Sequence, residues 1–255
     1  MKLASWNVNS IRARIDRVIP WLEATRPDVL CMQELKAEEK DFPREAFERI
    51  GYQVAAACQK TYNGVAICSL QPATDVMCGL GDGDDDPQAR LVAATVAGVR
   101  VLSAYVPNGQ SVGSDKYAYK LRWLERLRGY LDARCDPKAP LVLCGDFNVA
   151  PEERDVYDPV SWANETLFHI EARQALERVR AFGLTDTFRL HHEEAGVYSW
   201  WDYRMLSFPK NRGLRIDHVF VTEPLARRCA SAWIDREARK GKLPSDHAPV
   251  LASFE

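Results

Sequence analysis

The sequence predicts one α/β domain over residues 1–255, in which β-sheets pack together and helices cover the outside. The chain alternates short apolar runs with segments of helical periodicity, and its second half has many strand-like pieces but few long crossover helices. No linker, repeat or low-complexity stretch divides the 255 residues, and 46% of them are hydrophobic. A substantial common core is therefore expected.

The expected strands are short apolar runs. Residues 29–32, with the sequence VLCM, form a continuous apolar run of the kind found in strands that are covered on both faces. The remaining strand-like segments are residues 2–6, 100–106, 140–145, 197–201, 215–221 and 249–254.

Three segments show the apolar repeat of an amphipathic helix. The first ends before Pro27, the second begins near Ser114 and the third begins near Phe168. Their apolar stripes are Ile11, Ile15, Val18, Ile19 and Leu22 in the first, Tyr117, Leu121, Leu124 and Leu131 in the second, and Ala172, Leu176, Val179 and Phe182 in the third.

Composition excludes some classes of protein. The formal charge of −2 and the pI near 6.2 give no global attraction to polyanions, so a nucleic-acid ligand would require a local basic patch. The seven cysteines form no CxxC pair, which predicts neither a zinc ribbon nor a disulfide framework. The chain has no signal peptide and no stretch near the roughly 20 apolar residues of a membrane helix. We expect a cytoplasmic protein with reduced thiols and no membrane partner.

The acidic stretch at residues 79–87 has a superficial likeness to a calcium loop. It lacks the Asp-x-Asp-x-Asp-Gly register, the terminal bidentate Glu and the flanking helices of such a loop. A solvated turn is expected there.

Polar side chains able to do chemistry stand at the ends of five apolar runs. Taken singly, an Asp or Asn in such a place is most often a turn former or helix cap, and a Tyr is most often a core residue. Because packed strands hold their ends rigidly, five of them in one chain predict a shared crevice. They are Asn7, Glu34, Tyr105, Asp146 together with Asn148, and Asp217.

These residue types fit the chemistry of a hard cation acting on a phosphate ester. Glu34, Asp146 and Asp246 offer carboxylate oxygens, and Asn7 and Asn148 add amide groups. Such a set suits Mg²⁺, with Mn²⁺ as the alternative ion, because both bind through few carboxylates and through substrate phosphate oxygens. Zinc is disfavoured because few thiols or histidines lie near these positions. Phosphoester hydrolysis also needs hydrogen-bond donors and a base for water.

Two Asp-His pairs occur, in the segments RIDHVF and SDHAPV. Successive side chains of a strand face opposite sides, so Asp217 and His218 cannot both face the crevice. Asp246 and His247 lie in a loop between two prolines, where both can. We expect Asp217 to orient His247, Asp246 to lie on the metal side and His218 to be structural. A Ser-His-Asp hydrolase is disfavoured because the chain has no GxSxG elbow.

Eight segments carry a specific resemblance. They are WNVNSIRAR (6–14), DVLCMQELK (28–36), YNGVAI (62–67), YVPNG (105–109), GDFNVAP (145–151), YSWWDYR (198–204), NRGLRIDH (211–218) and SDHAPV (245–250). In this order, and over nearly the whole chain, they resemble the exonuclease III family of Mg²⁺-dependent DNA repair nucleases, within the endonuclease/exonuclease/phosphatase superfamily.

The resemblance implies a four-layered α/β sandwich, in which two packed mixed β-sheets are flanked by helices and the site lies at one edge of the sheets. Glu34 is then the principal metal ligand, and Asp246 and Asn9 lie near the metal through water. The whole metal-side set is Glu34, Asp246, Asn7, Asn9, Asp146 and Asn148.

The resemblance also implies catalytic roles. Asp146 orients or deprotonates the attacking water, the two asparagines position the water and the phosphate, and Tyr105 and His247 contact the scissile phosphate. The catalytic set is Asp146, Asn148, Tyr105, His247, Asp217 and Asn7.

The family's DNA-reading features have counterparts as well. Trp200, Leu214 and Ile216 match positions that line a pocket for a flipped-out abasic sugar. Because adjacent strand residues face opposite ways, we expect one of Trp200 and Trp201 in the core and one at the pocket. Basic side chains in loops are often merely solvated, but several stand where DNA contacts are expected. The candidates for DNA contact are Arg90, Asn108, Lys116, Arg204, Lys210, Arg212 and Arg215.

His169 follows the metal motif and borders the expected DNA groove. A bulky, partly cationic ring there would narrow the pocket or contact a terminal phosphate, and so tilt the enzyme toward 3′-end processing. The alternative is a water-exposed histidine at a helix N-terminus.

The function implied by the resemblance is hydrolysis of phosphoester bonds at abasic sites and 3′ ends of double-stranded DNA by a monomer. The activities are those of an abasic-site endonuclease, a 3′-phosphatase or 3′-phosphodiesterase, and a 3′→5′ exonuclease, in proportions that the sequence does not set. The alternative is a phosphoesterase that acts mainly on DNA 3′ ends or on RNA. A phosphatase for inositol phosphates or lipids would lack the NRGLRIDH and YSWWDYR segments in this form. A catalytically silent DNA-binding module is disfavoured because every catalytic position is filled.

Overall fold

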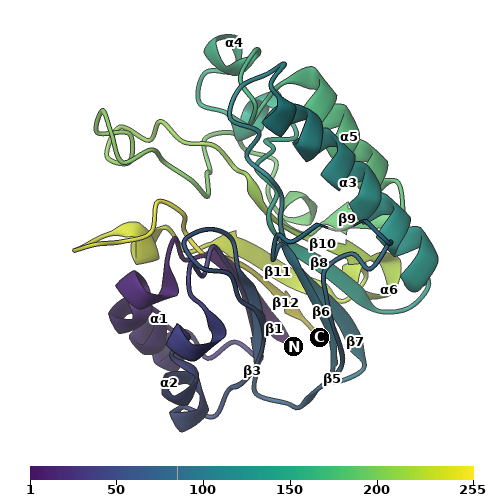
Figure 1. Ribbon diagram of the computed structural model, residues 1–255. Helices are drawn as coiled ribbons and strands as arrows, with labels where there is room; N and C mark the ends of the chain where they lie inside the picture. Colours follow the sequence, from purple (N-terminus) through teal and green to yellow (C-terminus); the bar gives the residue numbers. More distant parts are fainter. Residues whose placement is uncertain (85) are drawn as a thin grey trace.

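Two six-stranded β-sheets pack face to face, and helices cover the outer face of each sheet (Figure 1). The computed structural model describes residues 1–84 and 86–255. Its four layers confirm the predicted α/β sandwich.

The first sheet has the strand order β11-β12-β1-β2-β4-β3. β1 and β2 are parallel, and the other neighbours are antiparallel. The strands are β1 (Lys2–Asn7), β2 (Val29–Gln33), β3 (Gln53–Ala57), β4 (Val65–Ser69), β11 (Cys229–Ile234) and β12 (Val250–Phe254).

The second sheet has the order β5-β6-β7-β8-β10-β9, again with one parallel pair, β7 and β8, at its centre. The strands are β5 (Ala73–Cys78), β6 (Leu91–Val96), β7 (Val99–Tyr105), β8 (Leu141–Asp146), β9 (Leu184–Asp186) and β10 (Asp217–Thr222). Six of the predicted strands are confirmed to within two residues at each end, as β1, β2, β7, β8, β10 and β12. The strands β3, β4, β5, β6, β9 and β11 were not predicted from the sequence.

The helices form the two outer layers. The three predicted helices are confirmed as α1 (Ile11–Thr25), α3 (Asp115–Arg134) and α5 (Ile170–Arg180). Side chains of Ser10, Ser114 and His169 accept hydrogen bonds from the first turn of these three helices. The shorter helices are α2 (Arg44–Arg49), α4 (Pro159–Trp162), α6 (Glu223–Ala226), and the 3₁₀ turns η1 (Glu39–Asp41), η2 (Glu153–Asp155), η3 (Phe188–Leu190) and η4 (Arg236–Arg239).

Three apolar layers hold the sandwich together. Small and branched side chains such as Val29, Val101 and Val142 fill the space between the two sheets. The outer layers bury the apolar stripe of α1 against the first sheet, and those of α3 and α5 against the second. The strand ends are therefore fixed from both sides.

One expected strand, residues 197–201, is absent. Trp200 forms only isolated bridges, to Leu214 on one side and to His247 on the other. Both partners lie outside the named strands, Leu214 before β10 and His247 before β12, so the segment joins neither sheet. The expected alternation is confirmed, since Trp201 is fully buried and Trp200 is partly exposed.

Gly145 explains how closely β7 and β8 approach at the site. Its φ is +148°, and a Cβ there would lie 1.8 Å from the carbonyl oxygen of Ala104. Only glycine fits this position, which sets Tyr105 and Asp146 side by side in the ladder.

The remaining sequence predictions concern surface and compartment. Within the described ranges, no helix has the length and apolar content needed to cross a bilayer. All seven cysteines are free. Asp85 lies outside the described residues, and Asp82, Asp84 and Asp86 of the same acidic stretch form ion pairs with Arg126.

Candidate active site

The predicted residues meet where the carboxyl ends of the two parallel pairs face each other. Asn7 ends β1, Glu34 follows β2, and Tyr105 and Asp146 end β7 and β8. β10 runs antiparallel to β8, so Asp217 at its start pairs in register with Asp146. The loop before β12 is brought to the same edge because β12 runs antiparallel to β1.

Asn7 joins the two carboxylates at the centre of this edge. Its amide nitrogen donates to Oε1 of Glu34 and to Oδ2 of Asp146, both at 2.9 Å. Asp146 also accepts from the backbone N–H of Asn148 at 2.9 Å and from its amide at 3.2 Å. Asn148 adopts a left-handed conformation, with φ of 50°, that folds its side chain back onto Asp146.

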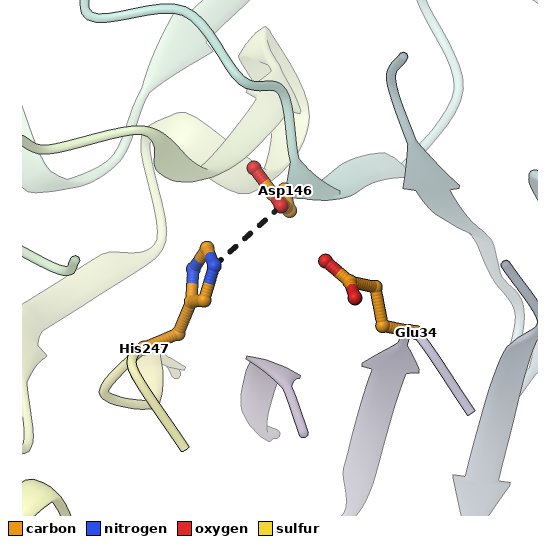
Figure 2. A group of neighbouring side chains, drawn as sticks. All are labelled: Glu34, Asp146 and His247. Atoms are coloured by element: carbon orange, nitrogen blue, oxygen red, sulfur yellow. Dashed lines mark ion pairs between the residues drawn. The ribbon is translucent and has the colours of Figure 1, made fainter. Parts of the chain in front are cut away.

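His247 lies across the cluster from Glu34 and forms an ion pair with Asp146 (Figure 2). Its Nδ1 lies 2.8 Å from a carboxylate oxygen of Asp217, which also accepts from the Ser199 hydroxyl at 2.6 Å. Its Nε2 lies 3.8 Å from Asp146. Asp217 thus holds His247 as the sequence predicted.

His218, the other histidine of the two pairs, points away from the site. Its Nε2 lies 2.9 Å from the carbonyl oxygen of Val149, and its Nδ1 lies 3.1 Å from Arg215. The predicted structural place of His218 is confirmed.

A second polar group lies beside the first. Lys36 pairs with Glu34 at 2.7 Å and donates to the amide oxygen of Asn9, also at 2.7 Å. Asn9 donates to Asp246 at 2.9 Å, and Asp246 accepts from the indole of Trp200 at 3.0 Å. This series of contacts connects the carboxylates of Glu34 and Asp246 to Trp200, which is partly exposed.

The electrostatics divide the site into acidic and cationic groups. Burial, together with the nearby carboxylates of Asp217 and Glu34, raises the pKa of Asp146. Although burial opposes a charge on His247, the carboxylates of Asp217 and Asp146 raise its pKa to about 10. Burial likewise opposes the charge on Glu34, but Lys36 and the Asn7 amide lower its pKa. Because its pKa is raised, the imidazole of His247 is a cation at neutral pH.

Glu34, Asp146 and His247 present possible ligand atoms that all lie within 4.8 Å of one another (Figure 2). Glu34 and Asp146 offer carboxylate oxygens to this cluster, and a protonated His247 would act as a hydrogen-bond donor. Hard carboxylate oxygens fit Mg²⁺. The amide nitrogens of Asn7, Asn9 and Asn148 donate to Glu34, Asp146 and Asp246, so the three asparagines orient these carboxylates.

A cleft of about 580 Å³ opens beside these carboxylates. Glu34 and Tyr105 of the site line this cleft, and Lys36, Arg90 and Lys116 add cationic side chains to its lining. Arg90 stacks its guanidinium 4.7 Å from the centre of the Tyr105 ring. Burial, with Glu34 and Asp146, raises the pKa of Tyr105, so its hydroxyl stays protonated. Asn108 also lines the cleft.

The prediction that Arg215 contacts DNA is wrong. Its side chain is 1% exposed, and it pairs with Asp155 at 2.6 Å and Asp186 at 2.8 Å. The exposed arginines and lysine of the same region are Arg204, Lys210 and Arg212.

The predicted pocket wall of Trp200, Leu214 and Ile216 is also corrected. Leu214 and Ile216 are fully buried with Val156 and Phe168, and Trp200 packs against this cluster. The two aliphatic residues therefore support Trp200 from behind, and Trp200 is the member of the three that reaches the surface.

His169 lies at the junction of two helices. Its Nδ1 is 2.9 Å from the Tyr117 hydroxyl in α3, and it also accepts from the N–H of Glu171 in α5. The ring is thus at a helix N-terminus, as one alternative predicted, but most of it is covered.

The sequence reasoning missed Lys36, Ser199 and Lys120. Lys36 stands two residues after Glu34, and Ser199 stands beside Trp200, so proximity to a predicted site residue was the available signal. Lys120 has helical spacing from Tyr117 and Leu124, which places a lysine on an apolar stripe.

Two mixed sheets with paired carboxylates and a cationic histidine at their common edge define a phosphoester-hydrolysing enzyme. The sequence matches the endonuclease/exonuclease/phosphatase family over residues 4–247, and the chain belongs to this family, as a nuclease of the exodeoxyribonuclease III group.

Relatives of known activity cover the chain along its whole length. Exodeoxyribonuclease III of Haemophilus influenzae is 34% identical over 100% of both chains. An AP endonuclease structure from Archaeoglobus fulgidus has a TM-score of 0.97 and 44% identity, covering 100% of this chain and 99% of that one. A Neisseria 3′ phosphatase bound to a product DNA hairpin has a TM-score of 0.95 and 41% identity, with coverage of 100% and 99%. These relatives support a DNA repair nuclease.

Proposed function

We propose that this chain is a Mg²⁺-dependent DNA repair nuclease that hydrolyses phosphoester bonds at abasic sites and at 3′ ends of duplex DNA. The observation that carries the proposal is the joining of Glu34, Asp146 and a protonated His247 in one cluster beside a cationic cleft. The relatives add the substrate, because they include an AP endonuclease, an exodeoxyribonuclease and a 3′ phosphatase bound to a DNA hairpin.

In the proposed reaction, Asp146 accepts the proton of the attacking water, which suits a carboxylate whose pKa burial raises. Asn7 and Asn148 hold the Asp146 carboxylate in place. His247 and Tyr105 donate hydrogen bonds to the phosphate oxygens, and Asp217 keeps the imidazole protonated and oriented.

Mg²⁺ would be held by Glu34 and Asp146, with Asp246 and Asn9 around it through water, and would stabilise negative charge on the phosphate. Mn²⁺ is the alternative ion for the same oxygen donors. Lys36 offsets the negative charge of Glu34 and donates a hydrogen bond to Asn9, so it would hold both side chains in place around the ion.

The test is one panel of Mg²⁺-containing assays on three duplexes, which carry an abasic-site analogue, a 3′-phosphate and a recessed 3′ end. Asp146→Asn should lower every true activity by about 10²–10⁴-fold, as expected for loss of a general base. Arg227→Gln, which alters an exposed side chain directly after α6, is the control and should keep full activity. DNA binding without cleavage of any of the three duplexes would refute the proposal.

The second candidate is an enzyme that acts mainly on 3′ ends or on RNA. His169 favours 3′-end activity if its ring restricts the groove, and its contact with Tyr117 places it beside the start of α3. His169→Gly should then raise abasic-site cleavage relative to 3′-phosphatase activity. An unchanged ratio would remove His169 from the specificity argument. A single-stranded RNA arm tests the remaining alternative.

We further propose that the chain works as a single-domain monomer in the cytoplasm. The seven free cysteines support a reducing compartment.

A further inference from the structure

Lys120 is a buried lysine in α3 that has no part in the reaction proposed above. Its ammonium donates to the backbone carbonyls of Asn108, Asn148 and Thr166, at 3.1, 2.6 and 2.8 Å. Three acceptors use all three N–H donors of the ammonium. Its partners are carbonyl oxygens and not a carboxylate, so the side chain serves as a hydrogen-bonding hub.

The three carbonyls belong to three different segments around the site. Asn108 lies in the loop after β7, Asn148 in the loop after β8, and Thr166 in the connection that leads to α5. The N–H of Ala150 donates to the carbonyl of Leu167 at 2.7 Å, which adds a second link between the last two segments. Among the side chains of residues 1–84 and 86–255, only that of Lys120 donates to all three carbonyls.

The arrangement is close-packed around the lysine stem. Gly109 has a φ of +94°, and a Cβ there would lie 3.1 Å from Cδ of Lys120 and 3.1 Å from Cδ2 of Tyr117. The first loop therefore passes directly over the stem, and little room is left for the ammonium to choose other partners.

A charge in this position opposes stability. Lys120 is fully buried in a helix whose neighbouring buried residues include Trp123, Leu124 and Leu127. Burial lowers the pKa of Lys120 to about 7, against the opposite effect of the Asp146 carboxylate. An apolar residue would fill the same stripe without this cost. The feature that an apolar residue cannot supply is the set of three donors.

Asn148 links the hub to the reacting groups. Lys120 holds its carbonyl, while its amide donates to Asp146 at 3.2 Å and to the Val106 carbonyl at 2.9 Å. The Asn108 amide donates to Asn148 Oδ1 at 3.2 Å. Both asparagines are thus held at backbone and side chain, and Lys120 supplies the contact to the backbone carbonyl of each.

We propose that Lys120 is a positioning residue for phosphoester hydrolysis, which acts by fixing the backbone of Asn148 and Asn108 beside Asp146. The inference rests on the proposed function, because it assigns to Lys120 an effect on the same reaction. A displacement of about 1 Å in such a positioned group is expected to lower the rate about 10²-fold.

The test compares Lys120→Met, which keeps the length of the side chain and removes the donors, with Leu124→Ala on the same buried stripe. Both variants lose stability, but only the first removes the contacts to the loops. We measure kcat and KM with Mg²⁺ on the best of the three DNA substrates, well below both unfolding temperatures. Lys120→Met should lower kcat about 10²-fold with little change in KM, and Leu124→Ala should keep the wild-type kcat.

A double-mutant comparison separates positioning through Asn148 from a general structural effect. If Lys120 acts through Asn148, then Lys120→Met should have much less effect on kcat in an Asn148→Ala background than in the wild type. Equal losses in both backgrounds, or a wild-type kcat in the single variant, would overturn the inference.

Lys120→Gln covers the case in which the methionine variant does not fold. It retains two N–H donors, and a kcat between those of wild type and Asn148→Ala is expected; a wild-type kcat would count against the inference. Cleavage by the wild-type chain is the separate check on the proposed function. An active wild type with an unaffected Lys120 variant would remove only the role of Lys120.

Discussion

Replacing Arg215 with methionine tests whether this residue stabilises the fold or contacts DNA. The guanidinium is buried between two carboxylates, at 2.6 Å from Asp155 and 2.8 Å from Asp186, and Arg189 pairs with Asp155 from another side. Burial opposes the charges on both carboxylates, but Arg215 lowers the pKa of each. Arg215→Met would leave Asp186 buried without its cation.

The expected loss of stability follows from that geometry. Removing one member of a buried ion pair destabilises a protein by about 3–5 kcal/mol, because the remaining charge stays desolvated. For a chain of this size, each kcal/mol lowers Tm by about 2–4 °C. We therefore expect Arg215→Met to lower Tm by roughly 6–20 °C at pH 7.

Thermal unfolding followed by circular dichroism measures the stability, and KM for duplex DNA at several salt concentrations measures the contact. Arg212→Met is the matched control, since Arg212 is exposed and lies three residues away. The control should keep the wild-type Tm, whereas any DNA contact by Arg212 would reduce the salt dependence of KM. If Arg215→Met keeps the wild-type Tm and instead reduces the salt dependence of KM, then Arg215 contacts DNA and does not stabilise the fold.

Three further outcomes are expected. Glu34→Gln should raise the Mg²⁺ concentration for half-maximal cleavage at least about tenfold, and an unchanged Mg²⁺ titration would remove Glu34 from the ligand set. Gly145→Ala should lower the free energy of unfolding in urea by at least about 2 kcal/mol because its Cβ would overlap the Ala104 carbonyl; Gly129→Ala, in an open helical position, should not destabilise. Burial lowers the pKa of His218 to about 4, whereas the imidazole of the unfolded chain binds a proton near pH 6.5. Because only the unfolded chain gains this proton between these values, wild-type stability should fall as pH drops from about 6.5 to 4. His218→Gln should flatten the urea-unfolding free energy over that window.

The strands that carry the site could be predicted from the sequence, because an apolar run and the polar residue at its end are local features of the chain. Asn7, Glu34 and Asp146 could be placed at one edge since parallel strands expose their carboxyl ends together. The pleat also separated Asp217 from His218 without any knowledge of their partners.

The errors arose where a residue's role depends on distant partners. Arg215 follows Asp155 by 60 positions, and nothing local shows that the two side chains meet in the core. The segment around Trp200 has strand-like composition, but Trp200 forms only single bridges, to Leu214 and to His247, outside both sheets. Backbone carbonyls bound by Lys120 have no sequence signature at all, although a lysine on an apolar stripe marks a position that needs explanation.

The balance of charge at the site gives a reason for the three asparagines. Four carboxylates converge at this edge, and the cations that pair directly with them are Lys36 and His247. Four negative and two positive charges leave a formal charge of −2, which one divalent cation would neutralise. The carboxylates are Glu34, Asp146, Asp217 and Asp246. An amide orients a carboxylate by hydrogen bonds without cancelling its charge, whereas a lysine or arginine in place of Asn7 would remove part of the attraction for the metal. Neutral donors therefore keep the carboxylates rigid and still charged, as a Mg²⁺ site requires.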